Sequence, residues 1–489
     1  MFEKFNHLAF NNPYYYKNKE GFVIEQNLSE LLNVYTGPRR IDPIAVIELL
    51  NKNYMFADRT IIQGIQRTPW LARPNVMSND WEYESAPKHS FSDIKEEEIA
   101  GTLFKKICSE IKAYIGNRKT VGVLLSGGMD SRMVAGALDF LIKKQEIKGV
   151  EVTGLTWGDD GTRDVVYSKR IALRLGWNWK HYKVTAGDLL NNIKETATHG
   201  CEYSPIHLHA IPQIRDDNNL DIILAGSYGD SIGRAEYSGI NVGSIKPISR
   251  KISNIGGFVH NAVFENSKRY ISTDVHRYHE RFPREKPYMQ NELDYQLHYM
   301  RRMLNPCMGL LADKTDICQV FTRPDVYGFM WSIDPSRRND LVYRHMLNEF
   351  ITKLDDIPWA RTGLPFGQIK GTPDSYLKKH HSYDRLVQND IFEEIVKLVS
   401  SEDIRRLNLF NYEAIKLLLS LVRRFPLQSM YYVEKLIWLA SLSVMAKVYD
   451  LQGVEPVESK QKYFDRSIVV VPSEYFIRKI KNMVVMPKR

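Results

Sequence analysis

A short apolar segment that runs directly into a glycine-rich turn constrains the fold of this chain most strongly. Residues Val121–Leu125 are almost continuously apolar, as expected of a parallel strand that is buried on both faces. The turn Ser126-Gly127-Gly128 follows, and Asp130–Lys144 has the composition of a helix. We therefore expect one strand–turn–helix unit of a parallel sheet, with the turn at the edge where open sheets bind ligands.

The segments that follow repeat this alternation of strand and helix. Further strands are predicted at Val150–Thr156, His181–Val184 and Asp221–Ala225. Helices are predicted at Arg163–Leu175, which ends before Gly176, and at Ala186–His199. The series predicts an α/β fold with a parallel sheet and helices on both faces.

The 489 residues divide into two predicted domains, the second of which contains this α/β series. Residues 1–90 are rich in aromatic side chains and irregular, with one helical stretch at Pro43–Leu50, and predict a reduced N-terminal domain. A second domain is predicted over residues 91–489, with its α/β core at about 118–235. We expect residues 240–290 to form a mobile lid or insertion. Strands should cease after about residue 285, where helical spacing recurs at Glu292–Leu304, Asp340–Leu354, Phe392–Val399, Tyr412–Leu419 and Leu436–Val448.

Composition and charge exclude several classes of protein. The chain is 43% hydrophobic and 26% charged, and no apolar run approaches the roughly 18 residues of a membrane-spanning helix. The N-terminus has no signal-peptide pattern, so a cytoplasmic location is expected. A net charge of +9 suits an anionic ligand such as a nucleotide, but it is modest for a nucleic-acid-binding protein, and no nucleic-acid partner is predicted. The four cysteines are scattered, which favours free thiols over zinc or disulfides.

The glycine turn has the chemistry of a phosphate site. Gly127 and Gly128 allow the backbone to approach an anion, and the helix behind them adds about half a positive charge. Ser126 and Ser131 add hydroxyl donors. A carboxylate such as Asp130 belongs among phosphates when it holds Mg²⁺. The turn lacks the Walker pattern, and the alternative interpretation is a tight glycine turn with a capping aspartate.

A second glycine turn follows the strand Asp221–Ala225. It reads Gly226-Ser227-Tyr228-Gly229-Asp230 and brings another carboxylate to the same edge of the sheet. Asp130 and Asp230 could share one Mg²⁺ ion or bracket a pair of ions. The alternative is an Asp230 that has no ligand.

These residues resemble the PP-loop ATP pyrophosphatases and, among them, the asparagine synthetase family. Residues 125–131 are similar to that family's LSGGxDS, and residues 224–230 fall where the family has LSGEGxDE. Asp164 with Tyr167–Gly176 resembles the family's D…A…A..LG helix. Residues 41–43 and 58–67 are similar to the stretch that joins the family's two domains.

The resemblance implies a fold, a reaction and roles for particular residues. The fold would be a PP-loop (adenine nucleotide α-hydrolase-like) domain with a large helical C-terminal part, and residues 1–90 would be the remnant of a glutaminase-like domain. In the family a carboxylate attacks the α-phosphate of ATP, which gives an acyl-adenylate and pyrophosphate, and an amine then displaces AMP. By resemblance, Leu124, Thr156 and Gly226 would line the AMP pocket, and Asp130 and Asp230 would hold Mg²⁺.

The sequence also departs from the family. Residue 2 is Phe where glutamine-using members have a catalytic cysteine, so no glutamine hydrolysis is expected. Ser227 replaces the glutamate of GEG, and the family's R-x-K reads Arg361-Thr362-Gly363. Arg361 remains a candidate catalytic residue beside Asp130 and Asp230, and Lys370 is the candidate substitute for the missing lysine.

These features together predict an ATP-dependent, AMP-forming carboxylate–amine ligase. Its partners would be ATP and an unidentified carboxylate and amine, which could be small molecules, a sugar acid or a peptide. Two alternatives stay open: an asparagine synthetase that takes free ammonia, and a non-catalytic relative that binds nucleotide.

Overall fold

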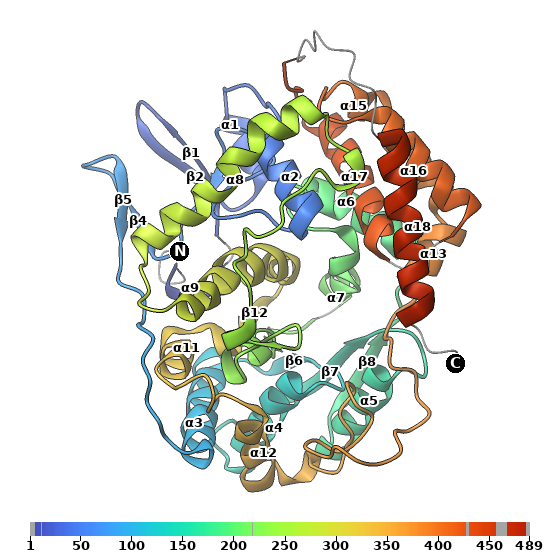
Figure 1. The fold of residues 1–489 in the computed structure, drawn as a ribbon. Coiled ribbons are helices and arrows are strands. Elements are labelled where there is room, and N and C mark those ends of the chain that lie inside the picture. The colour runs from blue at the N-terminus through green and yellow to red at the C-terminus, as the bar shows by residue number, and fades with distance from the viewer. Residues whose placement is uncertain (1–4, 11, 218, 427–429, 456–466, 486–489) are drawn as a thin grey trace.

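A five-stranded parallel sheet forms the centre of the computed structural model, which describes residues 5–10, 12–217, 219–426, 430–455 and 467–485. The strand order is β12-β9-β6-β7-β8, and every neighbouring pair runs parallel (Figure 1). The fold is therefore α/β, as predicted. The strands are β6 (Thr120–Leu124), β7 (Glu151–Trp157), β8 (Asn178–Tyr182), β9 (Ile222–Ala225) and β12 (Asp316–Gln319).

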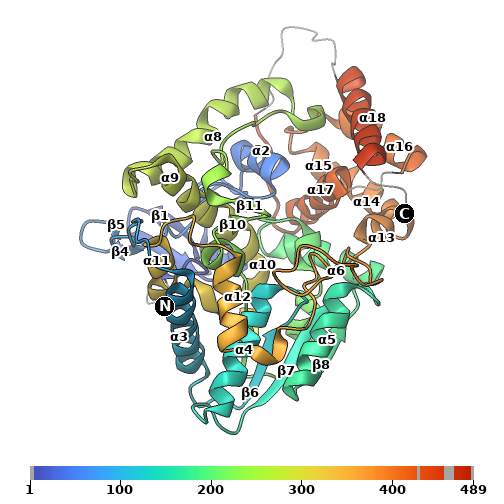
Figure 2. The ribbon, with the colours of Figure 1, turned by 60° about the horizontal axis from the view of Figure 1, so that its bottom comes forward.

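Two hydrophobic cores lie on the two faces of this sheet because successive residues of a strand point in opposite directions. Val121 and Val123 belong to the core with α3 (Glu96–Ile115) and α4 (Met129–Lys143), whereas Leu124 belongs to the other core. That second core contains α6 (Ala186–Thr198) and α17 (Met430–Val448). Figure 2 shows α3 and α4 packed beside α12 (Asp340–Glu349).

The helices of the α/β part agree closely with their sequence pattern. The helix α5 (Arg163–Leu175) has the predicted bounds and ends at Gly176, whose φ of 74° is the left-handed conformation that glycine accepts best. The strand β8 begins at Asn178, three residues before the predicted start. Its side chains alternate between exposed and half-buried because it is an edge strand, so it lacks the apolar run of a central strand.

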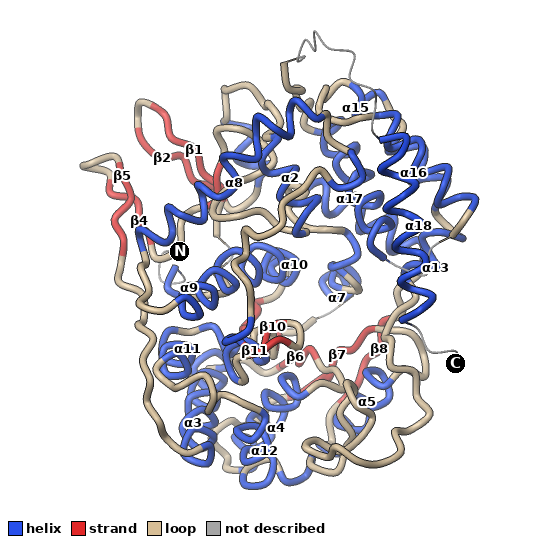
Figure 3. The backbone as a smooth tube through the Cα atoms, viewed as in Figure 1, coloured by secondary structure: helices blue, strands red, loops and turns tan. Residues whose placement is uncertain are grey.

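The N-terminal part is more regular than we predicted. Its strands β1 (Tyr14–Asn18), β2 (Gly21–Glu25) and β3 (Gln66–Arg67) form an antiparallel sheet, and β4 (Ala72–Asn75) pairs with β5 (Asp80–Tyr83). Figure 3 shows β1, β2, β4 and β5 apart from the central sheet. Two helices accompany them, α1 (Leu28–Val34) and α2 (Pro43–Lys52), and Asp42 caps α2 by accepting the Ile44 N–H.

Side chains of this N-terminal part enter both cores. Leu31 and Ile62 lie in the core of α6 and α17, whereas Trp70 lies in the core of α3 and α4. A buried ion-pair triad adds to the contact, since Glu202 bonds Arg67 at 2.9 Å and Arg302 at 2.8 Å. The first ninety residues thus share their cores with the rest of the chain, and a domain boundary at residue 90 stays a prediction.

The C-terminal part is predominantly helical, as predicted, with one correction. Strands do not cease at residue 285, because β12 pairs in parallel with β9 at the edge of the sheet. Its four residues, Asp-Ile-Cys-Gln, are too few to show a strand period. The remaining helices are α7 (Ile211–Asp216), α8 (Asn261–Arg281), α9 (Pro287–Asp294), η6 (Tyr295–Leu304, π-helical), α10 (Asn305–Gly309), α11 (Pro324–Trp331), α13 (Tyr383–Asn389), α14 (Phe392–Val399), α15 (Glu402–Arg405), α16 (Tyr412–Arg424) and α18 (Ser467–Val485).

The segment 240–290 contains a long helix where we predicted a mobile lid or insertion. The helix α8 has 21 residues and packs against α2. Its Val263, Ile271 and Val275 are buried at a spacing that keeps them on one face. The charged and histidine residues of this segment occupy the other positions of an amphipathic helix.

Candidate active site

The glycine turn after β6 folds into a compact loop at the N-terminus of α4. The Ser126 N–H donates to Ser131 Oγ at 3.2 Å, and the Gly128 N–H donates to Ser126 Oγ at 3.1 Å. The Gly127 N–H donates to the Asp164 carboxylate at 3.1 Å. These bonds fix the shape of the loop. Because α4 begins at Met129, the N–H groups of its first turn, which have no partner within the helix, lie beside the loop.

The second glycine turn, between β9 and η3 (Gly229–Gly233, π-helical), touches the first turn at backbone level. A Cβ atom on Gly226 would lie 2.6 Å from the carbonyl carbon of Asp130 and from the Ser131 N. A Cβ atom on Gly229 would lie 2.5 Å from Asp130 Cβ. Glycine is therefore required at both positions by the close approach of the chain.

This contact brings Asp130 and Asp230 close enough to perturb each other. Burial raises the pKa of Asp130, and Arg234, whose Nη2 lies 3.5 Å from its Oδ2, opposes that rise. Burial and the neighbouring Asp130 carboxylate raise the pKa of Asp230 to about 7. Arg234 and the Ser231 N–H, which donates to Asp230 Oδ1 at 2.8 Å, act in the opposite direction. Burial of a carboxylate and repulsion by a second carboxylate are two usual causes of a raised pKa.

The two carboxylates fit a magnesium ion that is also held by phosphate oxygens. Asp130 Oδ1 is buried and has no hydrogen-bond partner. Among the described residues no three His, Cys, Asp or Glu side chains gather as a complete metal cage. Mg²⁺ is usually bound through one or two carboxylates, with substrate phosphates and water supplying the other ligands. The predicted pair Asp130 and Asp230 therefore meets the requirement for a metal that arrives with ATP.

The three residues predicted for the AMP pocket lie at the carboxyl ends of neighbouring strands. Leu124 ends β6, Thr156 lies near the end of β7, and Gly226 follows β9. The Thr156 hydroxyl is buried, donates to the Leu125 carbonyl at 2.8 Å and accepts the Trp179 indole N–H at 3.2 Å. The side chain of Thr156 thus holds the loop to β7, and contact with a nucleotide at this position would fall to the backbone.

Arg361 lies near the carboxylate pair. Its guanidinium bonds the Glu236 carboxylate at 2.8 and 3.0 Å and lies over the Trp359 ring at 4.4 Å. Glu236 also pairs with Arg234 at 3.0 Å, so the two arginines and the carboxylates form one network. Arg361 also acts against the raised pKa of Asp130. The structure thus brings Arg361 together with Asp130.

Lys370 is exposed, and none of the contacts of the described residues joins it to this network. Its catalytic role stays a prediction. Position 363 itself cannot hold the family's lysine in this conformation. Gly363 has a φ of 74°, and a Cβ atom there would lie 2.6 Å from the Arg163 guanidinium.

Arg132 was not predicted from the sequence as a functional residue. It lies inside α4, directly after residues 126–131, the predicted phosphate loop. Its buried guanidinium donates to the carbonyls of Ile357 and Pro358 at 2.6 and 2.8 Å, and burial lowers its pKa to about 9. The Ala360 N–H in turn donates to the Gly127 carbonyl at 3.1 Å. Arg132 therefore holds the segment that carries Arg361 against the phosphate loop. An arginine among the apolar residues of a predicted helix was the available signal.

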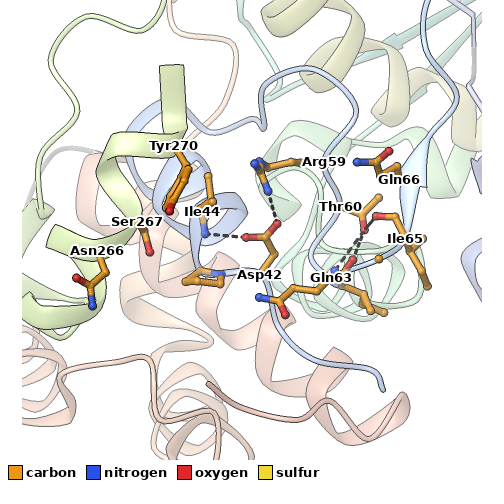
Figure 4. A pocket seen from close by; sticks show the side chains of 13 residues that line it. Asp42, Ile44, Arg59, Thr60, Gln63, Ile65, Gln66, Asn266, Ser267 and Tyr270 are labelled. Carbon is orange, nitrogen blue, oxygen red and sulfur yellow. Dashed lines mark hydrogen bonds and ion pairs between the residues drawn. The ribbon is translucent and has the colours of Figure 1, made fainter. Parts of the chain in front are cut away.

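Two cavities among the described residues bear on the search for a site, and the larger of these two carries no evident chemistry. It measures about 360 Å³ and lies between α2, residues 59–66 and α8 (Figure 4). Arg59 there pairs with Asp42 at 2.7 Å and with Asp274, so its charge is already compensated (Figure 4 shows the first pair). The smaller cavity, about 260 Å³, is lined by Asp130, Gly226 and Asp230 and therefore adjoins the phosphate loop.

Comparison with known proteins finds a family model and solved structures that match this chain. A family model described as asparagine synthase matches residues 114–232. No curated protein matches the sequence significantly. Among the solved structures that match is the U34-tRNA thiolase NcsA from Methanococcus maripaludis with its [4Fe-4S] cluster, at 16% identity. That match covers 49% of this chain and 90% of the thiolase chain, with a TM-score of 0.22.

The matched residues 114–232 include both glycine turns, Asp130 and Asp230. Within the described residues, no helix is long and apolar enough to cross a membrane. Residues 114–232 are therefore similar to the asparagine synthase family.

Proposed function

We propose that this protein is an ATP-dependent, AMP-forming ligase that joins a carboxylate to an amine through an acyl-adenylate, without hydrolysing glutamine. The observation that carries the proposal is the pair Asp130 and Asp230 beside the phosphate loop, with Asp130 Oδ1 buried and unpartnered. A carboxylate pair in this place suits a nucleotide whose phosphates arrive with a cation.

The loop and α4 would hold the pyrophosphate as it leaves. The first N–H groups of α4 and the hydroxyls of Ser126 and Ser131 are donors that face developing negative charge. Mg²⁺, when bound by Asp130 and Asp230, would neutralise part of the phosphate charge. Leu124, Thr156 and Gly226 would border the AMP moiety.

Arg361 would act on the reacting carboxylate or the α-phosphate. About two-fifths of its side chain is exposed, and its guanidinium is held near Asp130 by the Glu236 ion pair and by stacking on the Trp359 ring. An exposed pair of this kind is weak, so the guanidinium can exchange partners when an anionic substrate enters. Lys370 is the candidate for a second cation.

The environment of the first cysteine supports the absence of a glutaminase nucleophile in this chain. Cys108 is buried in α3, and burial and Glu146 raise the pKa of its thiol to about 12. A thiol with that pKa is not ionised near neutral pH, and the thiolate is the nucleophilic form. The amine would therefore be taken directly from solution or from a second substrate.

The test is formation of AMP and pyrophosphate. The protein is incubated with ATP, Mg²⁺ and a panel of carboxylic acids and amines, and both products are quantified. We expect Asp130→Asn to abolish turnover with the fold intact by circular dichroism, whereas the exposed Asp316→Asn should behave as wild type. Full activity in Asp130→Asn would show that the metal role is wrong.

The two other candidate functions give different results in the same assay. An asparagine synthetase that takes ammonia would form AMP only with aspartate and ammonium. A non-catalytic relative, for which Ser227 in place of the family glutamate is the motivating residue, would bind ATP and form no AMP with any acid.

A further inference from the structure

The smaller cavity lies between the second glycine turn and η6. Asp130 and Asp230 border it on the side of the phosphate loop. The opposite part of the lining comes from η6 and is largely apolar. It consists of Tyr299, Met300, Met303 and Leu304. The cavity therefore joins a polar mouth to an apolar wall.

Among the described residues that line this cavity, none carries a positive charge. Asp130 and Asp230 are the charged side chains of its lining, which contains no Lys, Arg or His. The nearby Arg234 is already engaged by Asp130, Glu236 and Asp340, at 3.5, 3.0 and 2.9 Å. A negatively charged group inside the cavity would lose its hydration without gaining a partner, close to two carboxylates.

The wall itself suits an apolar group of variable shape. Methionine side chains are flexible and polarisable, so Met300 and Met303 can adapt to different contours. The polar atoms of the wall also satisfy one another, since the Ser238 and Tyr299 hydroxyls are 3.4 Å apart. A bound group would therefore meet carbon and sulfur more than free donors or acceptors.

The size of the cavity limits what it can hold. About 260 Å³ is below the roughly 300–1,000 Å³ of sites that enclose a whole ligand. It is room for one part of a substrate whose reacting end lies elsewhere. The adjoining phosphate loop is where that end would meet ATP.

We propose that the acid activated by this protein is a monocarboxylate whose apolar body occupies the cavity between the second glycine turn and η6. Its carboxylate would lie at the mouth, where Arg361 and the Mg²⁺ held by Asp130 and Asp230 would compensate its charge. This inference rests on the proposed ligase function and specifies its substrate class. Aspartate does not fit, because its second carboxylate would lie in the cavity without a cation. The carboxylate oxygen would bond to the α-phosphorus of ATP at the mouth as the bond from that phosphorus to the bridging oxygen of the β-phosphate breaks, and pyrophosphate would leave toward the loop.

The experiment compares a monocarboxylate with a dicarboxylate in two pairs, of which hexanoate and adipate have equal length and differ in one charge. Pyrophosphate release from Mg²⁺-ATP is measured with hexanoate against adipate, and with 3-phenylpropanoate against aspartate. We expect the monocarboxylates to be favoured by about tenfold or more in kcat/KM. Binding of hexanoate and adipate is followed in parallel by ligand-observed NMR with a non-hydrolysable ATP analogue.

Variants of Met303 connect the preference to this cavity. Met303→Lys places a cation in the wall and should weaken hexanoate binding while improving that of adipate. Met303→Trp fills the space and should exclude 3-phenylpropanoate more than acetate, which provides a second test if the lysine variant folds poorly. The matched control Met77→Lys, at a fully exposed methionine between β4 and β5, should leave both preferences unchanged.

The possible results separate the substrate inference from the proposed ligase function. Preference of the wild type for adipate or aspartate, or a preference that Met303→Lys leaves unchanged, overturns the substrate inference while the ligase function stands. A binding preference for hexanoate without pyrophosphate from any acid overturns the ligase function and leaves an apolar-acid site.

Discussion

Replacing Asp230 by Asn should stabilise the fold and remove the activity at the same time. The side chain is half-buried, and burial together with Asp130 raises its pKa from 3.8 to about 7. A carboxyl group whose pKa is raised by folding lowers the free energy of unfolding once it ionises, because the native state disfavours the charge more than the unfolded chain does. Above pH 7 the native state must hold a second carboxylate beside Asp130.

The size of the effect follows from this rise in pKa. A difference of about 3 between folded and unfolded pKa values corresponds to about 4 kcal/mol of unfolding free energy. Solvent that reaches the partly exposed carboxylate reduces this figure, and we expect a gain of about 2 kcal/mol for Asp230→Asn at pH 8. The gain should be absent below pH 4, grow between pH 4 and pH 7, and then level off.

Urea unfolding from pH 4 to pH 8 measures this gain directly. The control is Asp217→Asn, since Asp217 is 63% exposed and pairs with Lys180 at 2.9 Å on the surface. The control should show no gain that grows with pH. In the same samples Mg²⁺-ATP should raise the Tm of the wild type but not that of Asp230→Asn. An Asn variant that is no more stable at pH 8 than at pH 4, relative to wild type, would refute the argument of a destabilised carboxylate pair.

Two further substitutions test the loop contact and a buried ion pair. Gly226→Ala should weaken ATP binding by about tenfold or more, because the added Cβ would lie 2.6 Å from backbone atoms of the phosphate loop; Gly101→Ala, where nothing lies within 4 Å, is the control in a calorimetric titration. Glu292→Gln should cost about 3–5 kcal/mol in urea unfolding at pH 7, because the fully buried Arg338 loses its charge partner at 2.6 Å. Arg338 also lowers the pKa of Glu292 to about 2 against the effect of burial, so the greater stability of the wild type should disappear as the pH falls from about 4.5 toward 2. The control is Glu393→Gln, which removes the exposed ion pair with Arg423 and should have little effect on stability. Equal losses at pH 7 and pH 2 would contradict the ion-pair explanation.

Local interactions account for what could be predicted from the sequence. The strand β6, its glycine turn and α4 are consecutive, and their apolar run, turn residues and helix start are all properties of neighbouring residues. The helix α5 had the predicted bounds because Gly176 supplies a local stop. Asp130 and Asp230 could be placed at one edge because parallel strands end on the same side of a sheet.

Long-range contacts decided the rest. The strand β12 forms because it pairs with the edge of β9, which lies some ninety residues earlier in the chain. Its own four residues are too few to show a strand period in the sequence. Arg132 finds its carbonyl partners more than 220 residues away, and the apolar cavity forms only where η6 meets the second glycine turn. The strand–turn–helix unit of β6 and α4, and the sheet edge that carries Asp130 and Asp230, could be predicted from the sequence, because strand, turn and helix signals act over a few residues. The repulsion that perturbs Asp230 and the cavity beside it could not be predicted, because both depend on segments that meet only when the chain is folded.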